Sequence, residues 1–221
     1  PDREFTYRGT IVSNGDVGYM GRKEKDRLNH TATTHGSIEQ AGGQWYVFYH
    51  RQTHGSDYSR QACAEPIEIA ADGSISQVEI TSCGLNGGAL SGDGEYPAAI
   101  CCNLTNGKMP HGGNASFSGI PMITHGDGER FLTGLTAGVK VAYKYFRLTE
   151  VSRFAVTARG SGTLCVFFDG RLEGEIEIDS EAWREYPCRV GHGGEKSAVT
   201  LEIAAGRLEI LSLRLDSSCS D

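Results

Sequence analysis

Apolar and polar residues alternate with a period of two through the second half of the chain. From Val139 to Tyr145, the residues Val, Val, Tyr and Tyr alternate with Lys, Ala and Lys. Because successive side chains of a strand point to opposite faces, each such stretch predicts a strand with one buried face. The same alternation recurs at 154–156, 164–168, 176–178, 199–203 and 211–215. Several short strands separated by turn signals such as Asp169-Gly170 predict an antiparallel β-sandwich.

The first half also predicts strands, but its apolar residues lie on both sides of them. The stretch Gln44–His50 is rich in aromatic and β-branched residues and follows Gly42-Gly43, with Ser37–Gln40 before the turn. This arrangement predicts a hairpin, in which Trp45 and Tyr46 pack in the core. Further strands are expected at 5–12, 61–69 and 78–80. No stretch longer than about one turn shows helical periodicity, so the chain is expected to be all-β.

Between the two halves the alternation disappears. Residues 84–128 contain Asn-Gly, Asp-Gly and Gly-Gly pairs, which are turn and loop signals. We therefore divide the chain into a first strand region at 1–84, a loop-rich connector at 85–128 and the sandwich at 129–221.

Composition and charge exclude several classes of partner. The chain has 221 residues, of which 38% are hydrophobic and 22% charged, as in soluble globular proteins. A formal net charge of −7 argues against nucleic acid and anionic membranes, which attract basic faces. No apolar run approaches the ~18–20 residues that span a bilayer. We expect neither a nucleic acid nor a membrane partner, and a neutral sugar suits this charge.

The cysteines favour a reducing compartment. There are 7 of them, an odd number, and Cys101 and Cys102 are adjacent. Buried thiols explain this pattern better than a disulfide framework does. The cytoplasm of a bacterium is thus favoured over secretion, although a fragment would show no signal peptide at Pro1.

The sequence offers weak metal signals. His50, His54 and Asp57 match no helix or zinc-finger spacing, so we favour a loop without metal there. The oxygen-rich stretch Gly126-Asp127-Gly128-Glu129 is a turn signal first and a candidate Ca²⁺ loop second. We expect that no cofactor is required.

A set of ordered motifs from Thr34 to Gly84 resembles the closing region of the family 43 glycoside hydrolases. The motifs are, in order, His35-Gly36-Ser37-Ile38, Gly43-Gln44-Trp45-Tyr46-Val47-Phe48-Tyr49-His50-Arg51, Ser59-Arg60-Gln61-Ala62-Cys63-Ala64-Glu65-Pro66-Ile67, Asp72-Gly73-Ser74-Ile75 and Thr81-Ser82-Cys83-Gly84. The tail from about Leu132 resembles a family 6 carbohydrate-binding module through its strand rhythm. The resemblance implies that residues 1–84 are the terminal blade region of a five-bladed β-propeller, followed by a jelly-roll-like sandwich.

The same resemblance implies a β-xylosidase or α-L-arabinofuranosidase acting on plant polysaccharides such as xylan. Such enzymes cleave the glycosidic bond with inversion of the anomeric configuration. They use an Asp as general base, a Glu as general acid and a second Asp that positions the acid, and inversion needs two carboxyl groups about 6.5–9.5 Å apart. None of the three has a match here, because Asp16, Glu24 and Asp26 lie too close to the His35 motif. We assign no catalytic residue, and we expect the chain alone to be inactive.

Two residues carry over from the family pattern. His35 resembles the His at the propeller centre, which contacts the substrate pocket or binds a central cation, such as a structural Ca²⁺, through water. Arg60 resembles a late-blade Arg that donates hydrogen bonds to sugar hydroxyls, a role that a planar cation with five donors suits. The expected ligand is a xylo- or arabino-oligosaccharide.

In the sandwich, Trp183 and Tyr186 flank a predicted loop and are the candidate sugar platforms, since flat rings stack on the C–H faces of sugars. Family 6 modules usually carry an Asn in the last loop, but residues 204–208 contain none. This departure favours a structural role for the sandwich.

Three hypotheses follow. The chain is the C-terminal segment of a pentose-releasing glycosidase whose catalytic groups lie elsewhere, a non-catalytic carbohydrate-binding unit, or an assembly fragment. In the third hypothesis, unpaired sheet faces associate with the missing blades or with a second copy.

Overall fold

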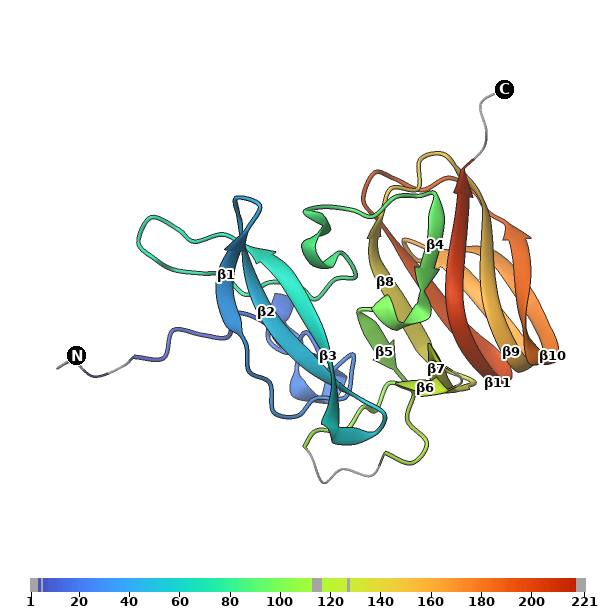
Figure 1. Ribbon diagram of the computed structural model, residues 1–221, viewed down its shortest axis with the longest axis horizontal. Helices are drawn as coiled ribbons and strands as arrows, with labels where there is room; N and C mark the ends of the chain where they lie inside the picture. Colours follow the sequence, from blue (N-terminus) through green and yellow to red (C-terminus); the bar gives the residue numbers. More distant parts are fainter. Residues whose placement is uncertain (1–3, 5, 113–116, 127, 218–221) are drawn as a thin grey trace.

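The computed structural model describes residues 4, 6–112, 117–126 and 128–217, which form two β-sheets joined by irregular segments (Figure 1). Four short 3-10 helices accompany the strands: η1 (Tyr19–Gly21), η2 (Glu24–Asp26), η3 (Gly84–Asn86) and η4 (Ala98–Ile100). The expected all-β fold is confirmed. In the described part of the chain, no helix has both the length and the apolar character that crossing a membrane requires.

The smaller sheet is antiparallel and has the order β1-β2-β3, with β1 at Ser37–Ala41, β2 at Gln44–Thr53 and β3 at Ser56–Ile67. The predicted hairpin is present, and Gly42 and Gly43 make its turn with φ of 58° and 85°. A turn with two positive φ values matches the twist of the flanking strands. One face of β2 is buried and the other is half-buried.

The larger sheet has eight strands around β11 (Ser197–Ser217). One edge of β11 pairs with β9, and the other pairs in turn with β8, β7 and β4. β10 lies beyond β9, β6 beyond β7, and β5 beyond β8. The remaining bounds are β4 (Gly94–Pro97), β5 (Asn103–Thr105), β6 (Met122–Gly126), β7 (Glu129–Thr136), β8 (Lys140–Phe146), β9 (Val151–Phe168) and β10 (Arg171–Arg189).

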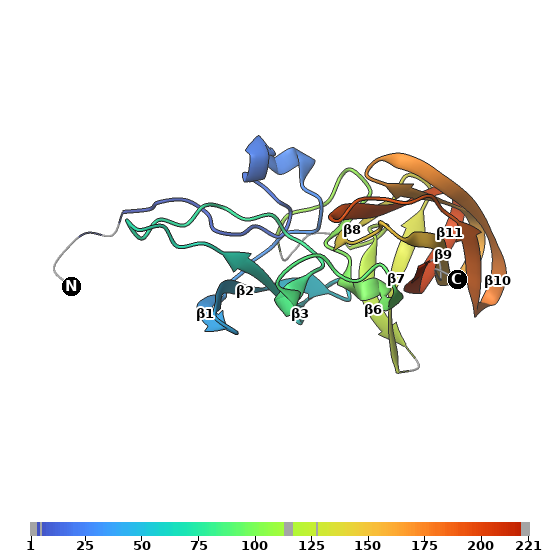
Figure 2. The same cartoon turned by 90° about the horizontal axis from the view of Figure 1, so that it is seen from above.

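The sandwich arises because the longest strands curl over a single core (Figure 2). At the bend, Gly162 and Gly206 lie opposite each other in the β9–β11 ladder. A Cβ on Gly206 would lie 2.0 Å from the carbonyl oxygen of Ser161, so only glycine permits this approach. The core inside the curl includes Tyr143, Phe154 and Leu201, all fully buried.

Four parts of the chain differ from the pattern expected of them. The stretch 78–80, expected as a strand, is irregular, and Trp45, expected in the core, is 39% exposed. The segment 85–128 contributes β4, β5 and β6 to the larger sheet, although its turn signals predicted a connector. Its strands have three to five residues, too few for a periodicity to show. The strand expected at 5–12 is irregular over its described residues, and Gly9 interrupts it with φ 125°. The candidate Ca²⁺ loop at 126–129 is the β6–β7 turn, and its Asp127 lies outside the described residues.

Candidate functional site

The structure brings His35 and Arg60 to the same face of the smaller sheet. Ser37 pairs with Phe48, so the register places His35 opposite His50. Gln52 pairs with Arg60 on the next strand. Paired residues share a face, and positions two apart on a strand do as well. His35, His50, Gln52 and Arg60 therefore line one face at one end of the sheet, which we call the histidine–arginine face.

Two side chains of β2 hold the segment that carries His35. The His50 ring nitrogens Nδ1 and Nε2 each lie 3.2 Å from a backbone oxygen, of His35 and Thr33 respectively. Gln52 Nε2 donates to the same Thr33 oxygen at 2.9 Å. The His35 and His50 rings meet edge to face with centroids 4.6 Å apart. These contacts hold the exposed segment 33–35 against β2 and thereby fix the position of the His35 backbone.

The opposite face of β2 packs on the larger sheet through a buried arginine. Arg51 Nη1 donates to Cys101 O at 2.5 Å, and Nη2 donates to Ala99 O at 2.7 Å and Gln61 Oε1 at 3.0 Å. A cavity of about 150 Å³ lies next to Arg51, lined also by Tyr49 and Cys102. The sequence analysis did not identify Arg51 as a buried structural residue. The signal was present, because Arg51 is two positions from Tyr49 and four from Val47 and therefore shares their buried face of β2.

Glu65 of β3 is a buried carboxylate. It accepts hydrogen bonds from Tyr49 Oη at 3.0 Å, Thr81 N at 2.7 Å and Thr81 Oγ1 at 2.6 Å. Burial raises the pKa of Glu65 from its ordinary 4.5 to about 7, although these three hydrogen bonds act in the opposite direction. Glu65 is therefore a titrating group inside the protein near neutral pH.

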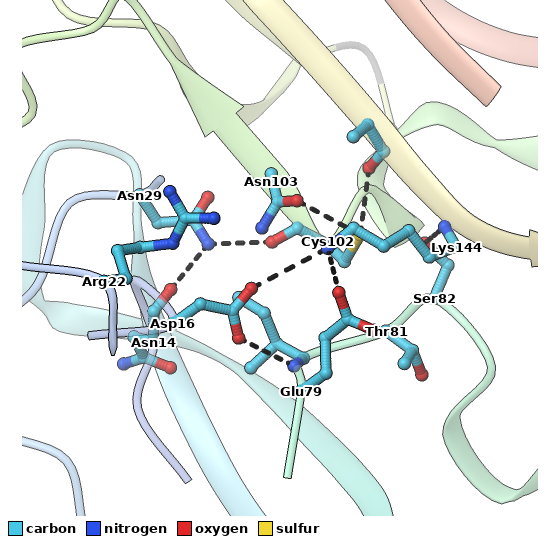
Figure 3. A network of polar contacts seen from close by, with 12 residues as sticks. Asn14, Asp16, Arg22, Asn29, Glu79, Thr81, Ser82, Cys102, Asn103 and Lys144 are labelled. Carbon is cyan, nitrogen blue, oxygen red and sulfur yellow. Dashed lines mark hydrogen bonds and ion pairs between the residues drawn. The ribbon is translucent and has the colours of Figure 1, made fainter. Parts of the chain in front are cut away.

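A second buried group of charges joins the N-terminal segment to β8 (Figure 3). Lys144 Nζ lies 2.7 Å from Glu79 Oε1 and 3.7 Å from Asp16 Oδ2. Tyr145 Oη donates to Glu79 Oε2 at 2.5 Å, and Ile80 N donates to Asp16 Oδ1 at 2.9 Å. Burial raises the pKa of Asp16. Partners within the protein thus use the oxygens of both carboxylates, which fits a structural role better than a catalytic one.

Asn14 and Asn29 connect this junction to the histidine–arginine face. Asn14 Nδ2 donates to Thr34 Oγ1 at 2.8 Å and to His50 O at 2.9 Å. Asn29 Nδ2 donates to Asn14 O at 2.6 Å and to Cys102 O at 2.7 Å. The segment before His35 is therefore attached to the larger sheet through two buried amides. In the sequence, Asn14-Gly15-Asp16 carries only a turn signal.

The cation that the family resemblance implies at His35 would need further ligands. Ca²⁺ takes six to eight oxygen ligands, whereas the neighbour of His35 is the imidazole of His50. Over the residues that the structure describes, no three or more His, Cys, Asp or Glu side chains form a metal-binding group. These residues alone do not fit a Ca²⁺ site, and the cation at His35 stays a prediction.

The sandwich candidates both lie in β10, where a loop was expected. Trp183 occupies the irregular stretch between Ser180 and Arg184. The Arg159 guanidinium covers one face of its ring at 4.3 Å from the centroid, and Phe131 meets it edge to face. The Tyr186 ring packs against the core, and its hydroxyl is buried without a hydrogen-bond partner in the described structure. Trp183 and Tyr186 are both half-buried.

A groove of about 570 Å³ lies on the sandwich and includes Arg159, the residue whose guanidinium covers the Trp183 ring. Arg159 Nη2 pairs with Glu209 Oε2 at 2.5 Å, and Thr133 Oγ1 donates to Glu209 Oε1 at 2.7 Å. Both charged side chains remain partly accessible to solvent. The groove is lined by Phe117, Thr133, Arg159, Glu181, Arg207 and Glu209, among others.

A curated relative agrees with the motifs in the first half. A xylosidase/arabinosidase of Thermoclostridium stercorarium is 36% identical over 205 residues, which are 86% of this chain and 43% of the relative. The chain is similar to a C-terminal portion of a family 43 glycoside hydrolase, with the last part of a propeller followed by a β-sandwich. No protein-family model matches the chain.

A solved structure shows the same fold. A family 43 arabinoxylan arabinofuranohydrolase from Bacillus subtilis, in complex with cellotetraose, matches with a TM-score of 0.55 at 18% identity, over 98% of this chain and 46% of that one. A family 6 carbohydrate-binding module matches 59% of this chain and 98% of its own, with a TM-score of 0.48 at 12% identity. The chain spans less than half the length of the xylosidase/arabinosidase and of the arabinofuranohydrolase that it matches.

Proposed function

We propose that the protein containing this chain hydrolyses pentosidic bonds of xylan-type polysaccharides, as a β-xylosidase or α-L-arabinofuranosidase. The observation that carries the proposal is the histidine–arginine face, to which the register of β1, β2 and β3 brings His35 and Arg60. The identity to a xylosidase/arabinosidase supports the pentose class of substrate.

In this proposal, the chain supplies positioning groups and the catalytic carboxylates lie on other blades. Arg60 is exposed on β3 and offers several N–H donors in a fixed plane, which suit sugar hydroxyls. His35 stands on a segment that His50 and Gln52 hold in place, so its ring is ordered before substrate binds. Inversion then requires an acid and a base about 6.5–9.5 Å apart with a water between them.

The test compares variants of the longer protein that carries the remaining blades. Removing a charged hydrogen-bond donor from a bound sugar costs about 1.5–3 kcal/mol, so Arg60→Ala should lower kcat/KM for an aryl α-L-arabinofuranoside or β-D-xyloside by about 10- to 100-fold. His35→Ala should also lower it. Lys25→Ala removes an exposed cation of η2 and should leave kcat/KM unchanged. If Arg60→Ala and His35→Ala both keep full activity, the proposed role of this face is wrong.

A second candidate function is carbohydrate binding by the sandwich, and the groove at Arg159 is the observation that favours it. Sugar sites combine ring surface with convergent polar groups, and here Arg159 pairs with Glu209 in the groove and covers the neighbouring Trp183 ring. That the B. subtilis structure holds cellotetraose agrees with a carbohydrate ligand for this fold.

Calorimetry of the chain with xylo- and arabinoxylo-oligosaccharides tests this candidate. If the groove binds sugar, Trp183→Ala should weaken binding about tenfold through lost ring contact. Trp45→Ala removes an exposed ring from the other sheet and should have no effect. No heat with any pentose oligomer would remove the candidate, and loss of binding only in Trp45→Ala would move the site to the propeller part.

A further inference from the structure

Two histidines distant in the sequence meet where the two sheets join. His54 lies in the β2–β3 turn, and His125 lies on β6 of the larger sheet. His54 Nε2 is in direct contact with His125 Nδ1, and the ring centroids are 4.6 Å apart. The backbone reinforces the approach, because His54 N donates to Ile123 O at 2.7 Å. The two residues are 71 positions apart in the sequence, and no motif spacing predicts that they meet.

The other nitrogen of His54 is held by hydroxyl groups. Its Nδ1 lies 2.7 Å from Thr53 Oγ1 and 2.8 Å from Ser59 Oγ. A hydroxyl oxygen that accepts from Nδ1–H fixes the tautomer and leaves the Nε2 lone pair directed at His125. Metal-binding histidines usually have this arrangement, in which a second group orients the ring through its remote nitrogen. His54 also has φ 61°, a left-handed conformation rare for residues with a Cβ.

We propose that His54 and His125 form a binding site for a divalent transition metal such as Zn²⁺ or Ni²⁺, which connects the propeller part to the sandwich. Imidazole nitrogen is a favoured ligand for these ions. Zn–N bonds of about 2.0–2.1 Å in a tetrahedral site place two nitrogens roughly 3.3 Å apart. His125 is exposed, and rotation of its ring opens this space. Water completes the coordination.

One charge acts against the site and supplies a test. Arg130 pairs with His125 across the β6–β7 hairpin and lies on the same face. Its positive charge repels a bound cation. Arg130→Gln should therefore tighten the binding of Zn²⁺ and Ni²⁺, whereas it would weaken the binding of an anion such as phosphate.

The experiment is isothermal titration of the full chain with ZnCl₂ and with NiCl₂. We expect one equivalent to bind, and we expect His125→Ala and His54→Asn to weaken binding at least about tenfold. Asn tolerates positive φ, so His54→Asn removes the imidazole without breaking the turn. His192→Ala removes an exposed histidine of the β10–β11 connection and should bind as the unchanged chain does. Bound metal should also raise Tm, and this rise should vanish in His125→Ala.

Three results would overturn the proposal. They are the absence of heat at millimolar metal, one equivalent bound equally well by His125→Ala and His54→Asn, and tighter phosphate binding than metal binding together with a loss of phosphate affinity in Arg130→Gln. None of these measurements depends on glycosidase activity, so they test the metal site independently of the proposed function.

Discussion

At the scale of single residues, the protein buries several polar groups between its two sheets, and Glu65 and Arg51 each have several hydrogen-bond partners there. Buried polar atoms without partners cost more than partnered ones contribute, so such groups mark positions where substitution is severe. Glu65 and Arg51 are the strongest cases, because Glu65 titrates near neutral pH and Arg51 donates to the backbone carbonyl oxygens of Ala99, in η4, and of Cys101, which follows η4.

Glu65 should make stability depend on pH. Its folded-state pKa of about 7 exceeds its ordinary 4.5, so the folded chain binds more protons than the unfolded chain between these values. The free energy of unfolding should then fall by about 3 kcal/mol as pH rises from 4.5 to 7. Glu65→Gln keeps an acceptor for Tyr49 and Thr81 and should remove this slope, as measured by urea unfolding at several pH values. The exposed control Glu68→Gln should keep the slope; a variant Glu65→Gln with the original slope would assign it to other groups.

Arg51 should be worth far more to stability than an exposed arginine. Arg51→Met roughly keeps the volume but leaves the Cys101 carbonyl oxygen buried without a donor, while the Ala99 oxygen keeps the hydrogen bond from Gln61 Nε2. An orphaned buried group costs about 1–3 kcal/mol, so the free energy of unfolding should drop by about that amount. Arg184→Met, at an exposed position of β10, should change it by no more than about 0.5 kcal/mol. Equal effects of the two substitutions in urea unfolding would refute the structural role of Arg51.

At the scale of elements, the sandwich depends on strands that bend sharply enough to enclose one core. Gly206 and Gly107 share φ 81°, but a Cβ on Gly206 would lie 2.0 Å from Ser161 O and one on Gly107 would meet nothing within 4 Å. Gly107→Ala should cost about 1–2 kcal/mol for the left-handed backbone alone. Gly206→Ala should add about 1–3 kcal/mol of steric strain and lower Tm further. If both lower Tm equally, the close approach at the bend is not what requires glycine.

The sequence predicted the strands whose alternation is long. The hairpin around Gly42-Gly43 and the strands of the sandwich were predictable because each buries one face, as Val141 and Tyr143 do. The strands β4 and β5 were not predictable, because with four and three residues they are too short to show an alternation. They are held in the sheet by hydrogen bonds to strands distant in the sequence. Trp183 was expected beside a loop, but the Ser180–Arg184 irregularity keeps it inside β10.

The candidate sites were predictable to different extents. The motifs around His35 and Arg60 identified both residues, and the strand register accounts for their shared face. Asn14, Asn29 and the His54–His125 pair depend on contacts between segments far apart in sequence, for which a single chain carries no local signal.

At the scale of the whole molecule, the smaller sheet exposes more large apolar side chains than the larger sheet does, where Leu172 of β10 is 50% exposed. Tyr58 is 96% exposed, Trp45 39% and Ile38 37%, all on β1, β2 or β3. Exposed aromatic and aliphatic groups on one sheet are typical of a surface that contacts a partner. A propeller blade contacts neighbouring blades in this way. The association with further blades is part of the proposed function, and a second copy of this chain is the alternative partner.

The most direct test of this account is hydrolysis by the longer protein of a matched panel of aryl glycosides. The account predicts release of the aryl group from an α-L-arabinofuranoside or a β-D-xyloside, no release from the corresponding glucoside and galactoside, and no release from any of them by the present chain alone. A longer protein that cleaves hexosides but neither pentoside, or that cleaves nothing, would contradict it.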